Sequence, residues 1–73
     1  MQRYSDIDRD SGVREFEIHD TSIIICFSGS RKTYTYSYQS AGKYHIEQMK
    51  RLALAGEGLN AYINKNVKDK SAR

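Results

Sequence analysis

The feature that most constrains the fold is the stretch from Ser22 to Tyr38, which has the pattern of a β-hairpin. Residues rich in β-branched and aromatic side chains lead into a turn around Gly29, and hydroxyl side chains then alternate with tyrosines. This composition and this period of two favour strands. Because side chains of a strand alternate between its faces, the tyrosines share one face and the hydroxyl groups the other. The tyrosines are Tyr34, Tyr36 and Tyr38, and the hydroxyl residues are Thr33, Thr35 and Ser37.

The segment before the hairpin extends it to a three-stranded meander. Residues 13–19 alternate in side-chain type, with Phe16 and Val13 on opposite faces. In the central strand Ile23 and Ile25 face one way and Ile24 the other, so both faces are apolar. The second face needs a cover, either the amino-terminal arm or a second copy of the chain. The arm carries two large apolar side chains for this purpose, Tyr4 and Ile7.

The chain has a single cysteine, Cys26, in the middle of the apolar central strand. No intramolecular disulfide is therefore possible, and we expect Cys26 to be a small buried hydrophobic residue. A reactive thiol would need exposure and a nearby cation, and the sequence around Cys26 indicates neither.

Two short helices are predicted after the sheet. Ser40 is placed to cap the first, residues 43–55, whose apolar side chains recur at helical spacing and form a stripe that packs on the sheet. Gly56 ends this helix as a left-handed cap, and a second helix runs from Leu59 to about Val67. On the outer side of the first helix, charged residues at four-residue intervals predict a ladder of ion pairs: Lys43, Glu47 and Arg51.

The predicted fold is therefore an α+β domain, a three-stranded antiparallel β-meander followed by two short helices packed on one face, in the order βββαα. A polar acidic arm covers residues 1–12, the domain covers residues 13–69, and residues 70–73 form a frayed basic tail. A chain of 73 residues makes one domain with a thin core, which favours self-association.

The acidic arm has the oxygen spacing of a calcium-binding EF-hand loop. Its residues at loop positions one, three, five and twelve are Asp6, Asp8, Asp10 and Glu17. Position six, where the sharp turn calls for glycine, is Ser11, and too few residues precede Asp6 to form the entering helix. Glu17 also falls in a predicted strand and would point outward from it. We therefore predict a flexible acidic arm and no metal or other cofactor.

Charge is unevenly distributed along the chain. The net charge is +3, but residues 1–28 hold three Lys or Arg against six Asp or Glu, whereas residues 29–73 hold nine against three. Such asymmetry can mark a contact with nucleic acid, although a solvated surface whose halves attract each other is the commoner cause. No apolar run approaches the ~18 residues needed to cross a bilayer, and the polar start has no signal-peptide core, so we expect no membrane contact and a cytoplasmic location.

The tyrosine face and the nearby basic residues form a candidate surface for RNA or single-stranded DNA, because rings can stack on unpaired bases while cations hold phosphates. The candidate residues are Arg31, Lys32, Tyr34, Tyr36, Lys65 and Lys68. Alternatively the tyrosine rings are buried under the helices, which is the commoner outcome for aromatic side chains on one strand face.

A family resemblance supports this fold. The run Cys26-Phe27-Ser28-Gly29, the motif Tyr34-Thr35-Tyr36, and the segment from Ala55 to Ile63 with Gly56, Gly58 and Asn60 resemble the KTSC domain, found at the carboxyl end of some lysyl-tRNA synthetases. The resemblance spans about Val13 to Asp69 and implies no catalytic activity. The proline-containing link that usually follows the Tyr-x-Tyr strand is absent, because this chain has no proline.

Two functions are compatible with these patterns. The first is a non-enzymatic, weakly nucleic-acid-associated accessory module, based on the basic residues, the tyrosine face and the synthetase context of the resemblance. The second is a protein-interaction module, homodimeric or inhibiting a partner, based on the thin core and the doubly apolar central strand. We predict no enzyme, because no nucleophile with a partnering base and no phosphate-binding glycine loop can be identified.

Overall fold

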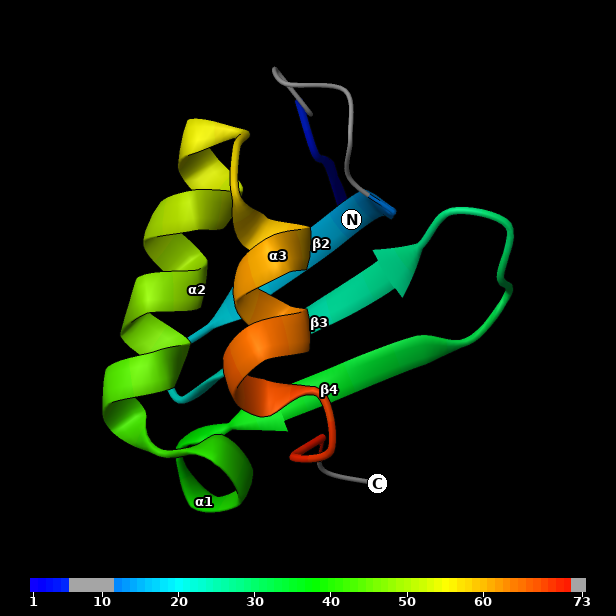
Figure 1. Ribbon diagram of the computed structural model, residues 1–73. Helices are drawn as coiled ribbons and strands as arrows, with labels where there is room; N and C mark the ends of the chain where they lie inside the picture. The colour runs from blue at the N-terminus through cyan, green and yellow to red at the C-terminus, as the bar shows by residue number, and fades with distance from the viewer. Residues whose placement is uncertain (6–11, 72–73) are drawn as a thin grey trace.

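The computed structural model describes residues 1–5 and 12–71, which form an antiparallel sheet with helices on one face (Figure 1). The sheet has the strand order β1-β2-β3-β4. Its strands are β1 (Gln2–Arg3), β2 (Val13–His19), β3 (Ser22–Phe27) and β4 (Thr33–Ser37). The helices are α1 (Tyr38–Ala41), α2 (Lys43–Ala55), α3 (Leu59–Tyr62) and the π-helix η1 (Ile63–Val67), which continues from α3. None of the helices in the described ranges is long and apolar enough to cross a membrane.

The α+β class and the meander β2-β3-β4 are confirmed, but the sheet has a fourth strand that the sequence did not predict. Strand β1 pairs with β2 through Gln2 opposite Phe16 and Arg3 opposite Glu15. The next residue, Tyr4, continues this pairing, because its backbone N–H donates to the Arg14 carbonyl at 2.9 Å. The beginning of the predicted arm is thus part of the sheet.

Tyr4 anchors this strand in the core rather than covering the second face of the sheet. Its ring packs edge-to-face on Phe16 with centroids 6.5 Å apart, and the residue is 4% exposed. Its hydroxyl accepts a hydrogen bond from the backbone N–H of Leu59, at the start of α3, at 3.2 Å. Tyr4 therefore does not cover the second face, which was one of two alternatives, and Ile7, the other apolar residue of the arm, lies outside the described residues.

The hydrophobic core lies between the helices and one face of the sheet. Ile23 and Ile25 of β3 point into it with Phe16 and Tyr36 from the flanking strands. The helices contribute Ile46, Met49, Ala53, Leu59, Ile63 and Val67. Both Val13 and Phe16 are buried in this core, although strict alternation predicted opposite faces. The register shift between Val13 and Glu15 is the reason, because a β-bulge inserts a residue and resets the alternation.

The opposite face of the sheet carries Ile24, which is half-buried, and Cys26. Cys26 is buried, as predicted, but outside the core cluster. The guanidinium Nη2 of Arg14 donates to its Sγ at 3.1 Å. The expectation of no cation beside this thiol is thus wrong, because the bulge in β2 places Arg14 next to it.

Helix α2 has the bounds that the sequence predicted, and Gly56 ends it in the left-handed conformation (φ 78°, ψ 22°). The cap predicted at Ser40 is wrong. Ser37 caps the short helix α1 instead, accepting from the Ser40 N–H at 3.1 Å, while the Ser40 hydroxyl accepts from the Ser37 N–H at 3.0 Å. This capping box ends β4, so the residue that follows Ser37 lies in a helix rather than in the strand.

The predicted ladder along α2 is replaced by a different set of contacts. Glu47 accepts from the Lys50 ammonium at 3.1 Å and from the Tyr38 hydroxyl at 2.6 Å. Lys43 lies over the Tyr38 ring, with its ammonium 5.9 Å from the centroid. Tyr38, at the start of α1, therefore contacts Lys43 and Glu47, two of the residues that the sequence predicted to form ion pairs along one helix.

Candidate binding groove along strand β4

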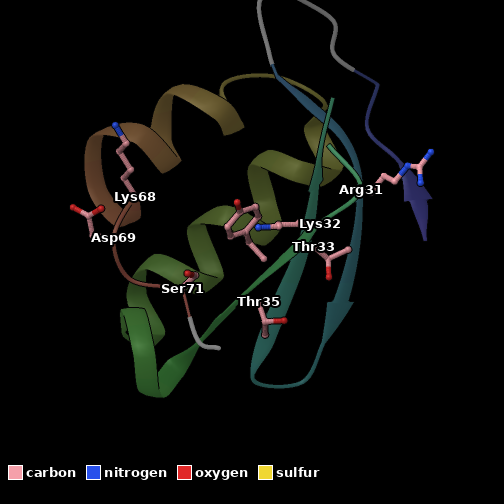
Figure 2. Close-up of a pocket in the computed structure, with 8 residues that line it drawn as sticks. Arg31, Lys32, Thr33, Thr35, Lys68, Asp69 and Ser71 are labelled. Carbon is pink, nitrogen blue, oxygen red and sulfur yellow. The ribbon is translucent and has the colours of Figure 1, made fainter. Parts of the chain in front are cut away.

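A groove of about 820 Å³ lies between β4 and the carboxyl end of the helical layer. Its lining comes from two segments far apart in the sequence, residues 31–35 before and in β4 and residues 68–71 after η1 (Figure 2). The lining residues are Arg31, Lys32, Thr33, Tyr34, Thr35, Lys68, Asp69 and Ser71, and we call this site the β4 groove. It thus holds three cationic side chains and one carboxylate.

The β4 groove follows the edge of the strand rather than one of its faces. Consecutive residues from 31 to 35 all line it, although alternate side chains of a strand point to opposite sides. In Figure 2, Lys32 points toward the end of the helical layer, whereas Thr33 and Thr35 lie on the other side of the strand. Strand β4 is also the last strand of the sheet, so its outer edge faces the groove.

Within the described residues, the backbone at this edge carries hydrogen-bonding groups that have no neighbouring strand. Just after the end of β4, the Tyr38 N–H donates to the Thr21 carbonyl at 2.9 Å. Tyr38 and Thr21 are therefore a hydrogen-bonded pair of the antiparallel ladder. Bonded pairs alternate along an antiparallel ladder, so Tyr36 and Tyr34 bond to β3 through Ile23 and Ile25. The N–H and C=O groups of the intervening Thr33 and Thr35 therefore point to the open edge.

A smaller and more apolar pocket of about 330 Å³ adjoins the β4 groove on the helix-covered side. It is lined by Phe27, Ser30, Tyr34, Tyr36, Ile63, Asn64 and Lys68, and we call it the inner pocket. Tyr34 and Lys68 line both sites, so the two are adjacent. Tyr34 is 37% exposed, and its ring packs edge-to-face on Phe27, with centroids 5.5 Å apart.

The six residues predicted to contact nucleic acid have different places in the structure. Arg31, Lys32, Tyr34 and Lys68 all line the β4 groove, although Arg31 points away from the helical end (Figure 2). Lys65 is exposed but lines neither the groove nor the inner pocket.

Tyr36 belongs to the core, in agreement with burial as the commoner outcome. It is 2% exposed, and burial, with a smaller contribution from Tyr34, raises the pKa of its hydroxyl. A tyrosine this deep cannot stack on a base, so a stacking platform of several tyrosines does not exist on this face. The two tyrosines differ in their position along the strand, because Tyr36 lies within the core cluster while Tyr34 lies nearer the hairpin turn.

The predicted calcium residues Asp6, Asp8 and Asp10 lie outside the described residues. Their distant partner Glu17 contacts the His19 ring, with its carboxylate 2.5 Å from Nε2, on the face of the sheet opposite the helices. Within the part of the chain that the structure describes, no three His, Cys, Asp or Glu side chains gather closely enough to hold a metal ion.

Sequence reasoning missed the parts of this site that carry no chemical signature. Thr33 and Thr35 matter through their backbone, and only the register of β4 against β3 shows which groups are free. Asn64 and Asp69 reach the site because α3 and η1 lead the chain back over β4. The basic run at the end of the chain includes Lys68, which lines the groove.

Comparison of the chain with protein-family models, curated proteins and solved structures finds no match.

Proposed function

We propose that this chain is a small non-enzymatic binding module that takes up an extended segment of another protein along β4. The observation that carries this proposal is the row of free backbone groups on Thr33 and Thr35, which faces a groove instead of a neighbouring strand. An extended peptide can add to such an edge as a further strand, with backbone hydrogen bonds for affinity and side-chain pockets for specificity. The inner pocket beside the β4 groove supplies such a place for a side chain.

Binding of single-stranded nucleic acid is the second candidate, favoured by Arg31, Lys32 and Lys68 around the groove. Its weakness is the single partly exposed ring, because sequence-tolerant binding of single strands relies on several aromatic side chains that stack on successive bases. The resemblance to the KTSC domain is compatible with both a peptide and a nucleic-acid ligand, since it implies a domain without catalytic activity.

The decisive experiment removes one backbone hydrogen-bond donor at the open edge and leaves the hydrogen bonds between β3 and β4 in place. The Thr35→Pro variant loses the N–H that faces the open edge, and proline is tolerated at such edge positions. The control Thr35→Val keeps the backbone and loses only the hydroxyl. Binding is measured by fluorescence anisotropy with a set of labelled decapeptides of acidic, neutral and basic composition, and with single-stranded dT and rU decamers.

The proposal predicts that decapeptides bind, that Thr35→Pro abolishes this binding while retaining a native circular dichroism spectrum, and that Thr35→Val leaves it intact. Equal peptide binding by wild type and a folded Thr35→Pro variant would refute strand addition. Binding of decamers alone, with log affinity falling by ~0.7 per phosphate contact against log salt and no effect of proline, would establish the nucleic-acid candidate instead. A dimer in sedimentation that Thr35→Pro converts to a monomer would identify a second copy of the chain as the occupant.

A further inference from the structure

We infer that the segment bound along β4 is acidic and carries one apolar side chain that enters the inner pocket, flanked by carboxylates two residues away. This inference rests on the proposed strand addition and specifies its ligand. It follows from three features of the described residues: the charge of the β4 groove, the lining of the inner pocket, and the alternation that a strand imposes on its neighbour.

The charge of the β4 groove selects against a basic or neutral partner. Three cationic side chains, Arg31, Lys32 and Lys68, line it against the single carboxylate of Asp69. Neither Lys32 nor Lys68 has an ion pair within the part of the chain that the structure describes, so both ammonium groups are available to a ligand. A second copy of this chain, paired edge to edge through β4, would bring a second set of the same cations to the interface. Carboxylates on the ligand remove that repulsion and match the potential of the groove.

The inner pocket fits an apolar side chain better than a charged one. Four of its seven lining residues are apolar or aromatic, namely Phe27, Tyr34, Tyr36 and Ile63, and the other three are Ser30, Asn64 and Lys68. The pocket lies on the helix-covered side of the sheet, where its floor is continuous with the hydrophobic core. A side chain of the added strand that points to this side would therefore be removed from water among apolar neighbours.

The strand period then determines where the carboxylates belong. Successive side chains of an added strand alternate between its faces, so residues two positions from the anchor point to the same side as the anchor. On that side lie Lys32, which points toward the helical end in Figure 2, and Lys68, which lines both the groove and the inner pocket. The pattern that fits is acid-x-apolar-x-acid. It distinguishes this ligand from a nucleic acid, which would need the cations but not the inner pocket.

Lys32, next to the edge strand β4, has an alternative explanation, because charged residues on an exposed edge strand also prevent aggregation between sheets. That explanation requires neither an adjoining apolar pocket nor a preference among ligands. A test with matched peptides separates the two.

The test uses three labelled heptapeptides with the wild-type chain: Thr-Asp-Thr-Leu-Thr-Asp-Thr, its analogue with lysine in place of both aspartates, and its analogue with serine in place of leucine. Lys68→Gln probes the charge, and Lys65→Gln is its matched control, an exposed lysine in η1 that lines neither site. Asn64→Tyr narrows the inner pocket from its exposed rim.

We expect the leucine peptide with aspartates to bind best, and the serine analogue to bind at least about 10-fold more weakly, because a buried leucine contributes that much to affinity. Lys68→Gln should weaken binding of the acidic peptide about 2- to 5-fold, as for a partly exposed ion pair, and Lys65→Gln should leave it unchanged. Asn64→Tyr should weaken the leucine peptide but not the serine analogue.

Three results would overturn the inference in different ways. If all three peptides bind equally and Thr35→Pro abolishes binding of each, strand addition stands but the acidic, anchored ligand is refuted. If Lys65→Gln and Lys68→Gln weaken the acidic peptide to the same extent, the charge effect is general and the groove does not select the ligand. If no peptide binds the wild type, both the inference and the proposed function fail.

Discussion

The amino-terminal strand should contribute measurably to stability, and the Tyr4 hydroxyl is the most specific place to test it. The Tyr4→Phe variant keeps the ring that packs on Phe16 but removes the acceptor for the Leu59 N–H. Leu59 is fully buried, so its donor cannot readily turn to water. An unsatisfied buried donor costs about 1–3 kcal/mol, a large share of the roughly 4–11 kcal/mol expected for a chain of this length.

The free energy of unfolding is measured by urea denaturation followed by circular dichroism, and the melting temperature should fall by about 4–8 °C for each kcal/mol lost. Tyr44→Phe is the matched control, because Tyr44 is 70% exposed on α2, and it should change stability by less than about 0.5 kcal/mol. Tyr4→Ala, which also removes the ring, should cost about 3–5 kcal/mol. Should Tyr4→Phe and Tyr4→Ala both match the control, the amino-terminal segment does not pack as described.

Three further predictions concern other parts of the chain. Hydrogen bonds from the Tyr38 hydroxyl and then from Lys50 lower the pKa of Glu47 below its ordinary value of 4.5, so their stabilising effect is present above that pH and is lost as the pH falls through the lowered pKa. Tyr38→Phe should therefore raise the pKa of Glu47 in an NMR titration, and an unchanged value would contradict this. Cys26 should react slowly with a thiol reagent in the native state, and rapid reaction of the wild type would show that it is not buried. Calcium below millimolar concentration should not raise the melting temperature, and a rise that Asp8→Ala removes would establish the EF-hand-like site.

The elements that sequence predicted well are those with a long and regular pattern. Helix α2 repeats its apolar stripe over several turns and is bounded by glycines, so its bounds could be predicted to the residue. Strands β2, β3 and β4 have a clear period or strong β propensity. Strand β1 has only two residues, too few for any period, and is held by contacts of Tyr4 with residues distant in sequence.

Errors within predicted elements have local physical causes. The bulge in β2 turns both Val13 and Phe16 inward, because one inserted residue shifts the alternation that periodicity assumes to be unbroken. At the end of β4, Ser37 and Ser40 form a capping box that begins the short helix α1, and Gly42 rather than Ser40 precedes α2. In both places the sequence contained the relevant residues but not the geometry that selects between them.

The candidate site could be predicted only in part, for a reason that differs between side chains and backbone. Clusters of cations are visible in the sequence, and the structure brings Lys32 and Lys68 to one groove because the last helix returns over β4. Free backbone groups have no sequence signature, since every residue except proline carries them. Their availability on Thr33 and Thr35 depends on which neighbouring pair bonds to β3, and therefore on register.

The two edges of the sheet differ in a way that connects stability with the proposed binding. The edge next to β2 is occupied by β1, whose two residues are too few to template a further strand and whose position is secured by Tyr4 in the core. The edge formed by β4 is longer, carries free backbone groups and opens into a groove with a surplus of cations. Because β1 occupies one edge and the β4 edge is accessible, the proposed strand addition would be confined to a single side. In that proposal, the cations around the β4 edge would disfavour a second copy of the chain and favour an acidic partner.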